Sequence, residues 1–214
     1  MKDVQSCLER RRVLADPFPR PKPALFLDRD GVLIEDKHHL CTPDEVVLCP
    51  GAKTLLAQAK QQEWPVVLIT NQSGIARGYF DWDAYERVTD SLLDLLGSTA
   101  PLAAIYANGH GPDAPATSWR KPSPAMLFAA AEDLQLDLSR SMLIGDRLSD
   151  LQAGAQASVP WLAHVLTGHG AQERAAVEHW ANQNEISTGQ NGYFELTLLQ
   201  SLAEVPFHRL TASR

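Results

Sequence analysis

Short apolar runs recur along the chain and alternate with longer segments of helical periodicity. Runs of five or six residues rich in branched side chains predict buried strands, because strands covered on both faces carry continuous rather than alternating apolar residues. Five such runs are present, at residues 24–28, 65–70, 103–107, 141–145 and 161–166.

Helix signals fill the segments between these runs. Residues 51–62, 81–96 and 123–134 predict helices. The second has acidic residues in its first turn, and the third begins with Ser123 at the N-cap and Pro124 at the first helical position. Strands joined through helices become parallel neighbours, so we predict an α/β fold: a three-layer, Rossmann-like parallel sheet with helices on both faces.

The strands and helices divide the chain into three parts. Residues 24–168 hold the predicted core. Residues 1–23 contain an arginine run and four prolines but no apolar stretch of the kind that exports a protein, so we interpret them as an extended spacer. Residues 169–214 are expected to form a helical extension packed on the core, with a loop over 186–194 and a last helix near 196–204.

Charge and composition limit the partners. The 214 residues carry a net charge of −7, and the first 23 contain six basic and three acidic side chains, so the remainder carries −10. An acidic core repels phosphate backbones, and no apolar run approaches the roughly 18 residues of a membrane helix, so we expect neither a nucleic acid nor a membrane partner. Three cysteines without a C-x-x-C pair indicate free thiols and the cytoplasm. We expect a monomer.

Polar side chains follow four of the five predicted strands. They are Asp28 and Asp30, Thr70 and Asn71, Arg120 and Lys121, and Asp146 and Asp150. Parallel sheets collect ligands beyond the carboxyl ends of their strands, so these side chains are expected to share one site. Three converging carboxylates repel one another unless a hard cation such as Mg²⁺ binds between them through oxygen ligands.

With a metal bound, Asp28 can act as a nucleophile and Asp30 as an acid or base. Lys121, Thr70 and Asn71 would hold phosphoryl oxygens, because phosphoryl transfer depends mostly on positioning and electrostatic stabilisation. Taken singly, the aspartates and the Thr70–Asn71 pair also have a structural explanation as helix caps or turn residues, and Lys121 has one as an exposed residue in extended chain before Pro122. Polar residues at four strand ends of one sheet favour a shared functional site over four separate structural roles.

These residues resemble the motifs of the haloacid dehalogenase (HAD) superfamily of phosphatases. The four motifs read "DRDGV", "LITNQSG", "RKP" and "GDRLSD". Together with "TNQSGIARGYF" and "RKPSPAM", they look like the histidinol-phosphatase-like branch, and are most similar to its D-glycero-D-manno-heptose 1,7-bisphosphate phosphatases over residues 24–168.

The resemblance implies a role for each residue. Asp28 would be the nucleophile that accepts the phosphoryl group, and Asp30 the general acid and then the base. Asp28, the backbone carbonyl of Asp30, and Asp146 would hold Mg²⁺, with Asp150 supporting them. The transferred phosphoryl group would be bound by Thr70, Asn71 and Lys121. The rest of a sugar phosphate would be bound by Arg77, Arg120 and Arg147.

Two features of the segments between the motifs bear on substrate choice. The intervals between the first three motifs are too short for a separate cap domain. The branch often carries a structural zinc loop, but "YANGHGPDAPATSWRKP" has no cysteine and only His110, so we expect no structural zinc and a solvated histidine. The implied substrate is a small phosphorylated metabolite such as a heptose bisphosphate. Histidinol phosphate, another small phosphate, and a catalytically silent phosphate-binding module remain alternatives.

Overall fold

A seven-stranded sheet forms the centre of the protein in the computed structural model, which describes residues 8–97, 100–184 and 194–206. The strand order is β1-β4-β3-β2-β5-β6-β7, and every neighbouring pair is parallel except β1 with β4. The strands are β1 (Glu9–Val13), β2 (Leu25–Leu27), β3 (Val66–Asn71), β4 (Leu102–Asn108), β5 (Met142–Gly145), β6 (Trp161–His164) and β7 (Glu195–Leu198).

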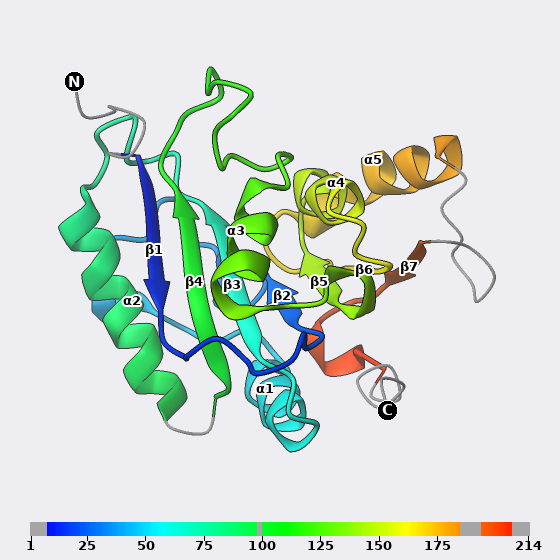
Figure 1. Ribbon diagram of the computed structural model, residues 1–214. Coiled ribbons are helices and arrows are strands. Elements are labelled where there is room, and N and C mark those ends of the chain that lie inside the picture. The colour runs from blue at the N-terminus through cyan, green and yellow to red at the C-terminus, as the bar shows by residue number, and fades with distance from the viewer. Residues whose placement is uncertain (1–7, 98–99, 185–193, 207–214) are drawn as a thin grey trace.

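Helices cover both faces of the sheet. They are α1 (Ala52–Gln61), α2 (Trp82–Leu96), α3 (Ala125–Leu134), α4 (Leu148–Gln156) and α5 (Gly170–Gln183), with short 3-10 turns η2 (Pro43–Glu45), η4 (Leu138–Arg140) and η5 (Leu202–Glu204). Leu25 and Leu27 of β2 share one apolar cluster with α1 and α2, whereas Phe26 joins the cluster formed with α3, α4 and α5. Figure 1 shows α3 and α4 in front of the sheet.

The predicted three-layer α/β fold is confirmed, and the five predicted strands are β2 to β6. The helices predicted at 51–62, 81–96 and 123–134 are α1, α2 and α3. No single helix within the described parts of the chain is both long enough and apolar enough to cross a bilayer.

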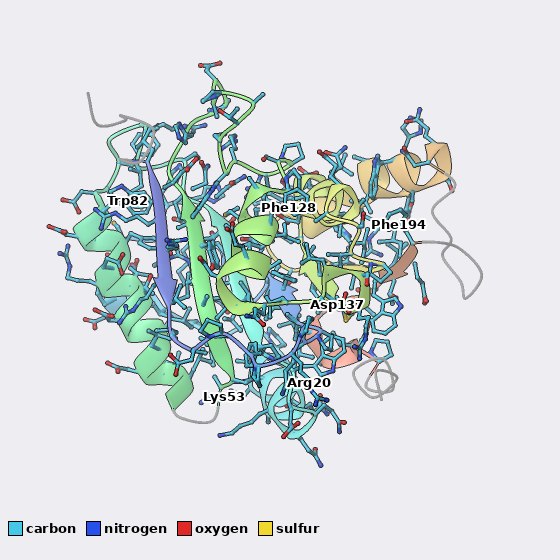
Figure 2. The ribbon with its side chains drawn as sticks, in the orientation of Figure 1. Arg20, Lys53, Trp82, Phe128, Asp137 and Phe194 are labelled. Carbon is cyan, nitrogen blue, oxygen red and sulfur yellow. The ribbon has the colours of Figure 1, made fainter. Side chains whose placement is uncertain are left out.

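The interpretation of the N-terminal segment as a spacer is wrong for residues 9–13, which form β1 at the edge of the sheet. This strand has no apolar alternation because its arginines find partners on the neighbouring helices. Arg10 lies over the ring of Trp82 at 5.1 Å, and Arg11 pairs with Asp133 at 2.8 Å. Figure 2 labels Trp82 beside β1. Ionic and cation–π contacts therefore hold an edge strand that the hydrophobic pattern does not predict.

The predicted helix near 196–204 is also wrong. Residues 195–198 form β7, which pairs with β6, and up to residue 206, where the described part of the chain ends, the short turn η5 is the helical element that follows it. A short leucine-rich segment fits either a strand or a helix, so periodicity alone does not separate the two. The loop predicted over 186–194 lies, apart from residue 194, outside the described residues.

The chain reverses its direction of winding at β2, which lies between β3 and β5 in the sheet. From β2 the chain proceeds through β3 to β4 on one side, and then crosses to β5 and β6 on the other. In open α/β sheets such a reversal leaves a crevice beyond the carboxyl ends of the two central strands. Asp28 follows the end of β2 and therefore stands at this crevice.

Candidate active site

A cleft of about 610 Å³ opens at the carboxyl ends of the strands. Most of the residues predicted from the sequence line it: Asp28, Asp30, Thr70, Asn71, Arg77, Arg120, Lys121, Arg147 and Asp150. Asp146 is completely buried and lies behind this lining. The structure thus brings the predicted site residues together.

Lys121 connects two carboxylates at the floor of the cleft. Its Nζ atom lies 3.0 Å from Oδ1 of Asp28 and 2.6 Å from Oδ1 of Asp150, and it also donates a hydrogen bond to the carbonyl of Ile69 at 2.8 Å. Burial would lower the pKa of Lys121, but Asp150 and Asp28 together raise it above its usual value. The lysine is therefore a fixed positive charge beside the Asp28 carboxylate.

Asp146 offers an unused oxygen toward this group. Its Oδ2 accepts a hydrogen bond from the backbone N–H of His169 at 2.7 Å, while its buried Oδ1 has no hydrogen-bond partner among the residues that the structure describes. One carboxylate oxygen from each of Asp28, Asp146 and Asp150 lies within 4.8 Å of the others. A hard divalent cation such as Mg²⁺ takes oxygen ligands of this kind, so the residues present fit the metal predicted from the sequence.

The pKa values show how strongly these carboxylates are crowded. Burial, and then the neighbouring charges of Asp150 and Asp30, raise the pKa of Asp28 to about 7, although Lys121 opposes the shift. Burial, followed by Asp150 and Asp28, raises the pKa of Asp146 to about 8. One lysine does not neutralise three buried carboxylates, and a cation would restore their ionised forms.

Asp30 is oriented by two residues that the sequence analysis did not assign to the site. Arg29 donates hydrogen bonds from Nε and Nη2 to its carboxylate at 3.0 and 3.1 Å, and Gln72 donates one from Nε2 at 2.7 Å. The same amide nitrogen of Gln72 donates to Oγ1 of Thr70 at 2.8 Å. Arg29 is fully buried, and its guanidinium lies 5.0 Å above the centre of the Tyr85 ring. The sequence did show both residues, inside the motifs "DRDGV" and "TNQSG", but gave no sign of their burial.

The side chain of Asn71 faces the backbone of Lys121. Asn71 donates from Nδ2 to the Lys121 carbonyl at 3.2 Å and accepts at Oδ1 from the Lys121 N–H at 3.1 Å. This reciprocal pair fixes the segment before Pro122, while Asn71 also lines the cleft where a phosphate contact is predicted. Asn71 positions the lysine.

Three arginines form the basic part of the cleft wall: Arg77, Arg120 and Arg147. Arg120 also donates a hydrogen bond to the carbonyl of His110 at 3.0 Å. Burial, and then the charges of the other two arginines, lower the pKa of Arg120. Three guanidinium groups that repel one another beside a cleft favour an anion between them.

The segment after β6 also contributes to the site, although β6 is the one predicted strand to whose end no polar group was assigned. Gly168 follows β6, and a Cβ built on it would lie 2.3 Å from Oδ2 of Asp146 and 2.5 Å from Cα of Gly31. Both glycines have positive φ, at +59° and +84°. Only glycine combines this backbone with so close an approach, so the two turns together enclose the Asp146 carboxylate.

His110 differs from its predicted solvated state. The residue is buried, and its Nε2 lies 3.7 Å from Oε1 of Glu9 on β1. This contact could not be predicted, because nothing in the hydrophobic pattern indicates that residues 9–13 form a strand of the sheet. Of the three cysteines, the structure describes Cys41 and Cys49, and both are free thiols.

Comparisons with known proteins agree with this geometry. A family model described as haloacid dehalogenase-like hydrolase matches residues 26–158. The D-glycero-beta-D-manno-heptose-1,7-bisphosphate 7-phosphatase of Mesorhizobium japonicum is 44% identical over 154 residues, which cover 68% of this chain and 71% of that protein. The D-glycero-alpha-D-manno-heptose-1,7-bisphosphate 7-phosphatase of Burkholderia mallei is 37% identical over 143 residues, with 64% and 76% covered.

A solved structure matches as well. The D,D-heptose 1,7-bisphosphate phosphatase of Bordetella bronchiseptica, in complex with magnesium and phosphate, superimposes with a TM-score of 0.72 at 33% identity, covering 90% of this chain and 99% of that one. The family match extends from β2 to beyond β5 and includes both acidic motifs that line the cleft. This chain belongs to the haloacid dehalogenase-like hydrolase family.

Proposed function

We propose that this protein is a Mg²⁺-dependent phosphomonoester hydrolase that transfers a phosphoryl group to Asp28 and then to water, with D-glycero-D-manno-heptose 1,7-bisphosphate as its substrate. The observation that carries this proposal is the buried Lys121, which pairs with Asp28 and Asp150 at the carboxyl end of the central strand. The names of the relatives from M. japonicum and B. mallei support the choice of substrate.

Two carboxylates would perform the chemistry. An oxygen of Asp28 forms a bond to phosphorus while the bond from phosphorus to the sugar oxygen breaks, and Asp30 donates a proton to that leaving oxygen. Asp30 then takes a proton from a water molecule that attacks the phosphorus, which releases inorganic phosphate and restores Asp28. Arg29 and Gln72 support this role because they hold the Asp30 carboxylate in one orientation at the cleft.

The metal would be held by Asp28, Asp146 and the backbone carbonyl of Asp30, with Asp150 fixing the lysine and the start of α4. Oδ2 of Asp150 accepts a hydrogen bond from the N–H of Arg147 at 3.0 Å, which supports that role. When bound, Mg²⁺ neutralises the crowded carboxylates and polarises the phosphoryl oxygens. Lys121 and the hydroxyl of Thr70 would bind the transferred phosphoryl group, and Asn71 would position the lysine.

The arginine wall supports a substrate with two phosphates. While one phosphate reacts at Asp28, the second would be bound by Arg77, Arg120 and Arg147, because guanidinium groups pair with phosphate in a bidentate manner. Replacing Arg147 with alanine is expected to raise the KM for the bisphosphate more than the KM for the corresponding monophosphate, since only the former presents a second anion. Equal changes for the two substrates would contradict this assignment.

The reaction is tested by phosphate release from both anomers of heptose 1,7-bisphosphate, histidinol phosphate and other small phosphomonoesters, each with Mg²⁺ or with EDTA. Asp28→Asn is expected to remove turnover almost completely. Asp30→Asn is expected to cost about 10²–10⁴ in rate, the usual scale of acid–base catalysis. Asp83→Asn, an exposed acid in the first turn of α2, is the matched control.

Each outcome is decisive. Turnover by Asp28→Asn at the wild-type rate would refute the mechanism, and release from histidinol phosphate alone would refute the substrate. Binding of phosphate without turnover of any ester would indicate a catalytically silent phosphate-binding module.

We also propose that the protein is a cytoplasmic monomer. The free thiols of Cys41 and Cys49 fit a reducing compartment, and light scattering of the purified chain tests whether it is a monomer.

A further inference from the structure

A second group of metal-type ligands lies at the cleft, separate from the buried carboxylates. It consists of Asp36, His38 and His169, and one ligand atom of each lies within 4.8 Å of the other two. All three residues line the cleft. Asp36 and His38 belong to the segment that follows β2, whereas His169 precedes α5, so the fold brings together ligands from distant parts of the chain.

Hydrogen bonds fix the carboxylate of this group from two directions. Oδ2 of Asp36 lies 2.8 Å from Nε2 of His169, and its Oδ1 accepts a hydrogen bond from the backbone N–H of His38 at 2.9 Å. Nδ1 of His38 lies 3.9 Å from the same Oδ1. The two imidazole rings are parallel to within 3°, with centroids 6.0 Å apart. Both rings therefore reach one carboxylate from neighbouring positions.

His169 is also held by contacts on its other side. Its backbone N–H donates to Oδ2 of Asp146, and its Nδ1 lies 3.4 Å from Oε1 of Gln172 in the first turn of α5. Histidines that bind metals are usually oriented in this way, through the ring nitrogen that does not face the ion. The remaining nitrogen, Nε2, is the one that faces Asp36.

We infer that Asp36, His38 and His169 bind one divalent transition-metal ion of the Zn²⁺ or Co²⁺ type. Two imidazoles and one carboxylate match the ligands of such ions, whereas Mg²⁺ prefers oxygen ligands and suits the carboxylates of Asp28 and Asp146. Three protein ligands leave at least one coordination position for water or for an oxygen of a bound ligand. This site does not depend on the hydrolysis proposed above.

The test is a titration of the full chain with Co²⁺ after treatment with EDTA, in the presence of excess Mg²⁺ to occupy the oxygen site. Visible absorption of Co²⁺ reports imidazole ligation, and competition with Zn²⁺ gives its affinity. We expect one bound ion per chain. His38→Ala and Asp36→Asn should each weaken binding by more than about 10-fold, because loss of even an outer partner of a metal ligand costs about 10–100-fold.

His179→Ala is the matched control, because His179 is an exposed histidine on α5 outside the group. The side chain of His38 is 86% exposed, so its removal cannot act by emptying the core. Binding that is unchanged in His38→Ala and Asp36→Asn would overturn the proposal. It would be overturned equally by a wild-type chain that binds no Co²⁺ beside Mg²⁺, or by binding that is lost in Asp28→Asn instead.

Discussion

Buried carboxyl groups make the stability of the metal-free protein fall as the pH rises. The pKa of Asp28 is about 7 and that of Asp146 about 8 in the folded chain, while both are about 3.9 in an unfolded chain. Between these values the folded protein binds protons that the unfolded chain does not, so the free energy of unfolding must decrease with increasing pH. The perturbation is removal of divalent metal with EDTA.

The magnitude follows from the number of protons. Each carboxyl that is protonated in the folded state and ionised in the unfolded state lowers the free energy of unfolding by about 1.4 kcal/mol per pH unit. Asp28 and Asp146 together contribute at most about 3 kcal/mol per pH unit above pH ~5, and the slope disappears as pH passes their folded-state pKa values. Saturating Mg²⁺ keeps both carboxylates ionised when folded, and should remove the slope.

Urea unfolding between pH ~5 and pH ~8, with EDTA or with Mg²⁺, measures this slope. His164 acts in the opposite direction, because burial lowers its pKa and its unfolded form gains a proton at acidic pH. Comparison with Asp28→Asn and Asp146→Asn cancels that contribution, and each variant should lose about 1.4 kcal/mol per pH unit of slope in EDTA. A slope shared by the wild type and both variants would refute the reasoning.

Three further predictions concern single contacts. Gly31→Ala places a Cβ 2.5 Å from Oδ2 of Asp146 at a φ of +84° and should weaken Mg²⁺ affinity, measured by calorimetry. Lys121→Met leaves two buried carboxylates unpaired and should lower the free energy of unfolding in EDTA by about 3–5 kcal/mol, with partial recovery in Mg²⁺; equal loss in both conditions would contradict this. Asp133→Ala removes the acceptor of the buried Tyr106 hydroxyl, 2.7 Å away, and should cost about 1–3 kcal/mol in urea unfolding, much of which Tyr106→Phe should restore.

The central strands could be predicted because their sequences indicate strand and no other element. β2 to β6 are fully covered, so apolar runs such as residues 65–70 mark them directly. β1 and β7 lie at the edges of the sheet, where the pattern is weaker. Arg10 and Arg11 of β1 contact Trp82 and Asp133, which are 70 residues or more away in the chain. The sequence around the two arginines does not indicate these partners.

The same distinction explains which parts of the site could be predicted. Asp28 and Asp146 follow parallel neighbours, so any sheet of this topology brings them to one crevice whatever the loops do. Their precise environment depends instead on loop contacts, since Asp146 is enclosed where Gly31 meets Gly168 and where the N–H of His169 reaches its carboxylate. Gly31 and Gly168 are 137 residues apart in the chain, and His169 and Asp146 are 23 apart, so no local pattern specifies these contacts. Topology therefore determines which groups react, while the loops determine how a ligand and its metal are held.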